Sequence, residues 1–361
     1  MLYNRKIVII GAGHVGTHCA AALSFQNICD EIVFIDKDEV KAKSQAMDLA
    51  DSVCFLPSAP IIRTGDYRDC EDADIIVISA GVPRLPGQTR LDTLGASIEC
   101  IKDVVDNLNK TDIKGIIITI TNPADIIAYY VRKHTGLPKN RVFGTGTSLD
   151  TARTRRTVAD LCKVDPHSVI GFAMGEHGDS SMVPFSHLTI NGDAYDKFVK
   201  EHGDRCIDFS EEKVTECTHM RGMDIINGKG STEFGIGAAL ADMAKAVLTN
   251  EHRVLPASVL LEGEYGQNNV NAGVPCIIGR NGIEEIIELK LTEEENKLFA
   301  SSCDVIREHI KVEEKTKRTK FIYKDVFDEM PLTEGRGQYI LIRRKPNERS
   351  SFIRMFSTKC R

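Results

Sequence analysis

The first 150 residues alternate between short apolar runs and longer helical patterns, and this alternation constrains the fold more than any other feature of the sequence. The apolar runs, rich in Ile and Val, cover 6–10, 31–35, 74–79 and 115–120. Segments with the spacing of amphipathic helices cover 14–26, 38–50, 92–109 and 123–135. Strands that are apolar along their whole length are typical of a parallel sheet covered by helices on both faces. The pattern therefore predicts an α/β fold.

A glycine-rich turn at 11–16, Gly-Ala-Gly-His-Val-Gly, joins the first predicted strand to the first predicted helix. Asp36 ends the next strand, 20 residues after the last of these glycines. Together these features are typical of a Rossmann-type, doubly wound parallel sheet that binds a dinucleotide. Gly11 would permit the tight turn, Gly13 would let the backbone approach the pyrophosphate, and Gly16 would let the helix pack against the strand. A glycine turn without a ligand is the alternative.

The same turn predicts which cofactor is bound. The helix that follows would direct its first N–H groups at the pyrophosphate, where the helix dipole favours negative charge. The carboxylate of Asp36 would hydrogen-bond the ribose hydroxyls and repel a 2′-phosphate, which favours NAD over NADP. The predicted cofactor contacts of this region are Gly11, Gly13, His14, Val15, Gly16 and Asp36.

The order of the predicted elements changes after about residue 150. Helical patterns and then strand patterns follow, the helices at 149–162, 211–227 and 233–249 and the strands at 254–262, 274–279 and 283–290. Asn281 and Gly282 are typical of a hairpin turn between the last two strands. This order predicts a second, α+β domain. The last predicted helix begins at Thr292, an N-cap residue, and ends near Val312.

Charge is distributed unevenly along the chain, although the net charge is only −6. Residues 315–361 contain 13 Lys and Arg against 5 Asp and Glu, whereas 1–314 contain 33 against 47. The acidic body argues against nucleic acid as the main partner. We therefore expect three parts: a NAD-binding Rossmann domain at 1–148, a catalytic, substrate-binding domain at 149–312 and a poorly ordered basic extension at 313–361.

Composition places the chain among ordinary globular proteins, with 42% apolar and 27% charged residues. No run reaches 18 apolar residues, so we expect no membrane span, and the first apolar run is too short for a signal peptide. The 11 cysteines form no CxxC pair and no metal-type spacing. Reduced thiols in the cytoplasm and no bound metal are the expectation.

The segment 175–180 reads Gly-Glu-His-Gly-Asp-Ser and places His177 on glycine-flanked, exposed backbone. Such a histidine is a candidate general acid–base. Asp150 is its candidate partner, because a carboxylate on one imidazole nitrogen fixes the tautomer and stabilises the imidazolium. Asp150 and Arg153 would share a helix face. They would form either a plain surface ion pair or a split pair, with Asp150 turned toward His177 and Arg153 toward a substrate carboxylate.

Two further polar segments follow predicted central strands, at the edge where doubly wound sheets bind ligands. The loop 81–90 carries Arg84 and Arg90 between flexible residues, which is typical of a mobile, positively charged lid and also of a plain solvated loop. Asn122 follows the strand at 115–120, where its amide could bond both cofactor and substrate. The Asn-Pro pair is equally typical of a helix entry with Pro at the first position.

These four motifs, in this order and spacing, resemble the L-lactate/L-malate dehydrogenase family. The resemblance covers residue 5 to about residue 312. The segment 175–180 is similar to the lactate dehydrogenase active-site signature. Three further segments resemble the branch of the lactate and L-2-hydroxyisocaproate dehydrogenases: Gly-Thr-Gly-Thr at 144–147, Leu-Asp-Thr-Ala-Arg at 149–153 and Gly-Lys-Gly-Ser-Thr at 228–232.

The resemblance implies an oxidoreductase that transfers a hydride between NAD and a small 2-hydroxy acid, in a homo-oligomer that is a dimer or tetramer. His177 would be the general acid–base and Asp150 would orient it. Arg90 would close with the lid and polarise the substrate carbonyl. The implied substrate contacts are Arg153, Asn122, Arg84 and Thr232. Asn122 would also contact the cofactor.

The substrate depends on Arg84, which falls at the family's substrate-selecting position. The resemblance implies an arginine at this position in malate enzymes and a glutamine in lactate enzymes. A cation suits the second carboxylate of the malate-type substrate. Glu176, Thr232 and the second half as a whole resemble the lactate branch. The resemblance therefore favours an L-lactate dehydrogenase that reduces pyruvate with NADH, with a malate dehydrogenase as the alternative.

Two other classes of protein fit part of the sequence. A non-catalytic dinucleotide-sensing protein would keep the glycine turn and Asp36, but it would not need His177 and its neighbours. A NAD-dependent glycosidase would need a metal-binding Cys/His pair, for which Cys162 and His187 are the nearest candidates. A hydride-transfer assay with several 2-oxo acids would distinguish these classes from a 2-hydroxy acid dehydrogenase.

Overall fold

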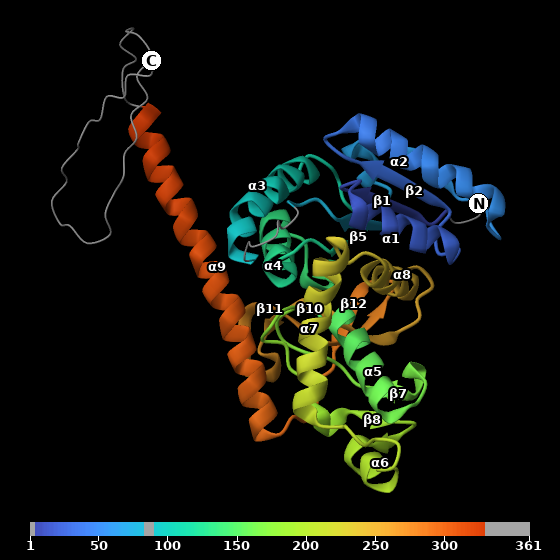
Figure 1. Cartoon of the computed structure of the whole chain (residues 1–361). Helices are drawn as coiled ribbons and strands as arrows, with labels where there is room; N and C mark the ends of the chain where they lie inside the picture. Colours follow the sequence, from blue (N-terminus) through green and yellow to red (C-terminus); the bar gives the residue numbers. More distant parts are fainter. Residues whose placement is uncertain (1–3, 83–89, 329–361) are drawn as a thin grey trace, which may run out of the picture. The chain divides into compact units, whose positions relative to one another are not determined.

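The computed structural model describes residues 4–82 and 90–328 of the chain (Figure 1). The chain divides into two units, one that ends at Glu313 and one that begins at Glu314. The first unit contains the sheets and helices α1 to α8, and helix α9 begins in it. Of the second unit, the structure describes the continuation of α9.

Six parallel strands form the Rossmann half of one large sheet. In spatial order they are β6 (Val142–Gly144), β5 (Ile116–Thr119), β4 (Ile75–Ile78), β1 (Lys6–Ile10), β2 (Glu31–Ile35) and β3 (Ile61–Thr64). All of them except β3 are buried along their whole length. The unbroken apolar runs predicted this burial for β1, β2, β4 and β5. The strand order reverses between β1 and β4, the switch point at which such sheets bind ligands. The predicted doubly wound α/β fold is confirmed.

Three antiparallel strands extend this same sheet beyond β6, in the order β10 (Arg253–Glu262), β11 (Asn268–Gly279) and β12 (Gly282–Ile286). They were expected in a second, α+β domain, and the pairing of Ser258 of β10 with Gly144 of β6 joins them to the Rossmann sheet. β11 begins six residues earlier than predicted and β12 ends at Ile286 rather than 290. The predicted hairpin turn is confirmed, and Gly282 closes it with a φ of +86°.

The helices predicted before Thr292 are all present, with ends within two residues of the predictions. They are α1 (His14–Phe25), α2 (Glu39–Asp51), α3 (Arg90–Leu108), α4 (Ala124–Thr135), α5 (Ser148–Cys162), α7 (Glu211–Lys229) and α8 (Phe234–Leu248). A Cβ on Gly237 of α8 would lie 3.0 Å from the His18 carbonyl oxygen of α1, so the two halves pack closely. Across 4–82 and 90–328, no helix combines the length and apolar character needed to cross a bilayer.

A smaller substructure packs on α5 and was not predicted from the sequence. It contains α6 (Tyr195–Glu201) and a three-stranded sheet of β7 (Val169–Ile170), β8 (Thr189–Ile190) and β9 (Asp193–Ala194). Its apolar side chains form a second core cluster with the buried face of α5. Strands of two residues are too short to leave a periodic pattern in the sequence.

Helix α9 (Glu293–Asp328) begins where predicted but continues beyond Val312, the predicted end. Its start is a capping box, in which Glu295 N–H donates to Thr292 Oγ1 at 3.2 Å and Thr292 N–H donates to Glu295 Oε2 at 2.9 Å. The helix does not stop at 312 because 313–328 contain no Gly or Pro and are rich in Lys, Glu and Arg. The expectation for 329–361 falls outside the described residues.

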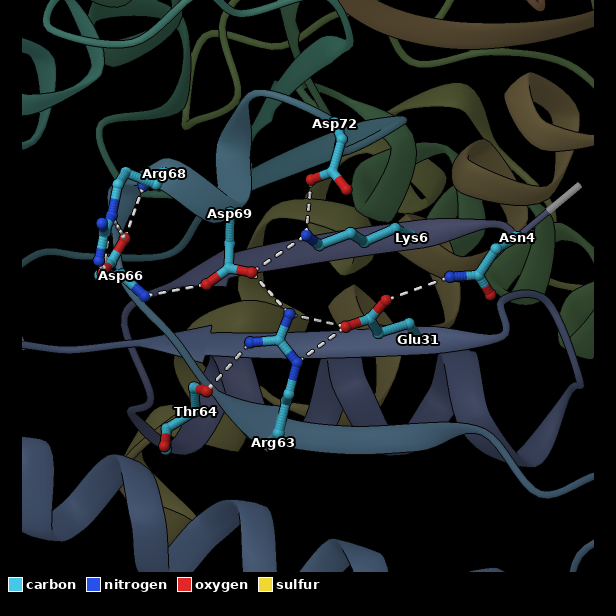
Figure 2. Close-up of polar contacts among 9 residues, drawn as sticks. All are labelled: Asn4, Lys6, Glu31, Arg63, Thr64, Asp66, Arg68, Asp69 and Asp72. Atoms are coloured by element: carbon cyan, nitrogen blue, oxygen red, sulfur yellow. Dashed lines mark hydrogen bonds and ion pairs between the residues drawn. The ribbon is translucent and has the colours of Figure 1, made fainter.

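An ion-pair network connects the first three strands along the chain (Figure 2). Asp69 accepts hydrogen bonds from Lys6 Nζ at 3.0 Å and from Arg63 Nη2 at 2.6 Å, and Arg63 Nε also donates to Glu31 at 2.8 Å. Burial acts to raise the pKa of Asp69, but the bonds from Arg63 and Lys6 outweigh it and hold that pKa at about 2. The network joins residues of β1, β2 and β3, and β3 is the edge strand of the sheet.

Candidate active site

The loops after β1 and β4 meet at the switch point of the sheet. Gly11 has a φ of +107°, and a Cβ there would lie 2.6 Å from the backbone nitrogen of Ala80. A Cβ on Gly16 would collide with the Gly11 carbonyl oxygen, so α1 packs tightly on the turn. Gly13, by contrast, has no atom within 4 Å of its Cβ position. The turn is therefore packed on one side and open at Gly13, where a pyrophosphate would need space.

Asp36 fixes the shape of this turn. Its Oδ2 accepts the Ala12 N–H at 2.7 Å and its Oδ1 accepts the Asp38 N–H at 3.0 Å. The carboxylate thus lies at the end of β2, directly beside the glycine turn. His14 and Val15 form the first turn of α1, and the imidazole of His14 is largely exposed. An open turn, a helix N-terminus and an adjacent carboxylate are the features that fit a dinucleotide.

His177, Asp150 and Arg153 form a connected and largely buried group. Asp150 Oδ2 lies 2.6 Å from His177 Nδ1, and its Oδ1 accepts a hydrogen bond from Arg153 Nη1 at 3.1 Å. The side chains of Asp150, Arg153 and His177 are 6%, 12% and 14% exposed. The interpretation of Asp150 and Arg153 as a surface ion pair is therefore wrong. Asp150 contacts both the imidazole of His177 and the guanidinium of Arg153.

The loop that carries His177 is held by two other elements. Gly175 exchanges backbone hydrogen bonds of 2.9 and 2.7 Å with Gly273 of β11. Glu176 N–H donates to Ser302 Oγ of α9 at 2.8 Å. A Cβ on Gly175, whose φ is +91°, would collide with the side chain of Ser302. Glycine is thus required at this position, because the loop passes directly over α9.

A second carboxylate, which the sequence did not indicate, also holds the histidine loop. Asp125 lies in the first turn of α4 and is 2% exposed. Its Oδ2 accepts the His177 backbone N–H at 2.7 Å, and its Oδ1 accepts the Ser258 hydroxyl at 2.6 Å. Burial raises the pKa of Asp125 to about 6, against the opposing effect of these bonds. The signal in the sequence was an acidic residue two positions after Pro123, but such a residue also favours the start of a helix.

The remaining predicted site residues lie on different elements. Asn122 is exposed between β5 and α4, and its cis peptide bond leads into Pro123, which precedes α4 and is not its first residue. Thr232 is half-buried between α7 and α8. Arg90 is the first residue of α3. Arg84 lies outside the described residues.

The group around His177 has the elements of an acid–base site. A carboxylate on Nδ1 leaves Nε2 as the ring nitrogen that can exchange a proton with a ligand. Arg153 supplies a cation that suits a carboxylate. For the glycosidase alternative, the thiol of Cys162 is buried and contacts Cys206. Nowhere in the described ranges do three His, Cys, Asp or Glu side chains gather as metal ligands.

Comparison with known proteins identifies the family. Residues 5–144 match the lactate/malate dehydrogenase NAD binding domain, and residues 147–317 match the lactate/malate dehydrogenase alpha/beta C-terminal domain. This chain belongs to the lactate/malate dehydrogenase family. The predicted family, the fold class, the NAD cofactor and the enzyme class of NAD-dependent dehydrogenase are thereby confirmed.

Relatives within the family are similar over their whole length. The L-lactate dehydrogenase 3 of Bacillus anthracis is 43% identical over 309 residues, which are 86% of this chain and 98% of the relative. The L-lactate dehydrogenase of Fusobacterium nucleatum subsp. nucleatum is 43% identical over 312 residues, with the same coverage. The crystal structure of a minor L-lactate dehydrogenase from Enterococcus mundtii, with ligands bound, superposes with a TM-score of 0.82 at 36% identity, covering 86% of this chain and 98% of that one.

Proposed function

We propose that this chain is an L-lactate dehydrogenase that reduces pyruvate with NADH to L-lactate and NAD, and catalyses the reverse reaction. The observation that carries the proposal is the buried His177–Asp150–Arg153 group in a chain of the lactate/malate dehydrogenase family. A protein that only senses a dinucleotide would have no use for a buried acid–base pair beside an arginine. The names of the relatives support lactate as the substrate.

In this reaction NADH supplies a hydride to the keto carbon of the substrate. The attack builds negative charge on the keto oxygen, and His177 Nε2 donates the proton that neutralises it. Asp150, 2.6 Å from Nδ1, holds the imidazole in the orientation that presents Nε2 and stabilises its protonated form. In the reverse direction His177 accepts the proton from the hydroxyl of lactate.

The substrate is held and polarised by the other predicted site residues. Arg153 binds its carboxylate, and Asp150 keeps that guanidinium in place. Arg90 polarises the keto group and so stabilises the developing oxyanion. The further substrate contacts are Asn122, Arg84 and Thr232. The residues that would hold NAD are Gly11, Gly13, His14, Val15, Gly16, Asp36 and Asn122, and the carboxylate of Asp36 would bond the ribose hydroxyls.

Malate dehydrogenase is the second candidate, because of Arg84. A guanidinium at the substrate-selecting position suits a substrate with a second carboxylate. The test is NADH oxidation by the full-length protein with pyruvate, oxaloacetate and longer 2-oxo acids, each measured for kcat/KM. A preference for pyruvate is expected. A preference for oxaloacetate would establish the malate alternative, and no oxidation with any 2-oxo acid would contradict a dehydrogenase of this class.

A homo-oligomer, either a dimer or a tetramer, is the proposed assembly. Large apolar side chains are exposed along α2 and the turn after it: Val40 is 77% exposed, Met47 60% and Phe55 89%. Large apolar side chains that are exposed on neighbouring segments are typical of an interface between subunits. Light scattering on the purified protein tests this, and a monomeric mass at micromolar concentration would contradict it.

The cytoplasm is the proposed location, where reduced thiols are usual.

A further inference from the structure

We propose that Asp125 is a positioning residue for the reaction, which fixes the main chain of His177 and so determines where the imidazole meets the substrate. The inference rests on the proposed role of His177. Two carboxylates contact different parts of His177. Asp150 binds the ring at Nδ1, and Asp125 accepts the backbone N–H of the same residue at 2.7 Å. His177 is thereby held at both ends.

The placement of Asp125 connects three parts of the active site. Asp125 lies three residues after Asn122, at the start of α4, so its position is tied to the end of β5. Its second oxygen is fixed by Ser258 at 2.6 Å, on the buried face of β10. A shift of α4 or of β10 would therefore move the backbone of His177. Positional errors of about 1 Å can lower the rate of an enzyme roughly 100-fold.

The charge of Asp125 gives it a second effect on His177. A buried charge is expensive unless it is hydrogen-bonded or paired, and both oxygens of Asp125 accept hydrogen bonds. The titratable groups that act on Asp125 are His177 and Glu176 on the loop, and Asp125 in turn acts on Cys303 of α9. Among these, only a protonated His177 is a cation. The charge on Asp125 therefore favours the imidazolium that donates the proton.

Glu295 serves as a control, because it is also a buried carboxylate that accepts a serine hydroxyl and a backbone N–H, in addition to the Thr292 N–H of its capping box. It is 9% exposed and accepts the Ser186 hydroxyl at 2.6 Å and the Ser186 backbone N–H at 3.0 Å. Asp125→Asn and Glu295→Gln each remove one charge with little change of shape. Asp125→Ala also removes the hydrogen bonds to His177 and Ser258. If the alanine variant does not fold, Asp125→Asn still tests the inference.

The experiment measures kcat with pyruvate, the Kd for NADH, the melting temperature and the pH dependence of kcat/KM for each variant. For Asp125→Asn we expect kcat to fall about 10- to 100-fold and the Kd for NADH to stay within about twofold. The basic limb of its pH profile should move to lower pH, since a negative charge near the imidazole is lost. For Glu295→Gln only the melting temperature should fall.

Two results would overturn the inference. The first is a kcat for Asp125→Asn within about twofold of wild type, because general positioning effects are larger than this. The second is an equal loss of kcat in Glu295→Gln, which would mark both losses as structural. Failure of the proposed function is a separate outcome, since it would appear as no NADH oxidation by the wild-type protein with any 2-oxo acid.

Discussion

At the scale of single residues, Asp36 tests the cofactor assignment. Its carboxylate accepts the Ala12 N–H at 2.7 Å beside the glycine turn, where a 2′-phosphate would meet a negative charge. Asp36→Ser should narrow the preference for NADH over NADPH about tenfold, which corresponds to about 1.4 kcal/mol. The measurement is kcat/KM with each cofactor, and Asp38→Ser, two residues away, is the control. Equal use of NADPH by the wild-type enzyme would contradict the assignment.

Arg84 tests the substrate assignment at the same scale. If its guanidinium meets the substrate, Arg84→Gln should lower kcat/KM for oxaloacetate relative to pyruvate by about 10- to 100-fold, because a pairing between arginine and the second carboxylate is lost. The ratio is obtained from initial rates of NADH oxidation with the two acids. An unchanged ratio would show that Arg84 does not contact the substrate.

The site residues show what sequence reasoning can and cannot find. The pairing of Asp150 with His177, and the shared helix face of Asp150 and Arg153, agree with the structure. Asp125 was missed because its contacts join parts of the chain far apart, and Ser258 lies 133 residues further along. An acidic residue in the first turn of a helix is also common for purely local reasons, since it favours the helix dipole.

At the scale of secondary-structure elements, the network on β1, β2 and β3 stabilises the edge of the sheet. Because the pKa of Asp69 is lowered to about 2, its ionised form stabilises the folded state. This contribution is complete above the unfolded pKa of about 4 and is lost as the pH falls toward 2. Asp69→Asn should lower the free energy of unfolding at pH 7 by about 2 kcal/mol, measured by urea denaturation. The difference from wild type should shrink below pH 4.

Asp72→Asn is the control for this prediction. Asp72 also bonds Lys6, at 2.6 Å, but its side chain is 75% exposed. An exposed ion pair contributes at most about 1 kcal/mol, so the loss should be clearly smaller than for Asp69→Asn. Equal losses in the two variants, or a difference that persists unchanged at pH 2.5, would contradict the account of the network.

Elements with a strong periodic pattern were predicted well, and short or polar ones were not. The apolar strands and the helices from α1 to α8, except α6, follow the sequence closely. β6 was missed because it has only three residues, Val142–Gly144, and without β6 the pairing of β10 with the Rossmann sheet could not be foreseen. β3 was missed because its four residues are partly exposed and mixed in polarity.

At the scale of the whole molecule, the segment after the family match is the feature to test. The match ends at residue 317, and the first compact unit ends at Glu313. A chain cut after Lys315 should therefore keep its kcat and its melting temperature to within about 2 °C. A chain cut after Arg307 also loses the buried Ile310 of α9 and should melt several degrees lower. Lost turnover in the longer fragment would show that the catalytic unit includes the basic extension.

The most direct test of the account is the turnover of His177→Asn with pyruvate, measured as NADH oxidation alongside NADH binding. The asparagine cannot donate the proton that the keto oxygen needs, but it leaves the glycine turn and Asp36 untouched. The account predicts a fall in kcat of roughly 10²- to 10⁴-fold with an unchanged Kd for NADH. Near-normal turnover of this variant would contradict it.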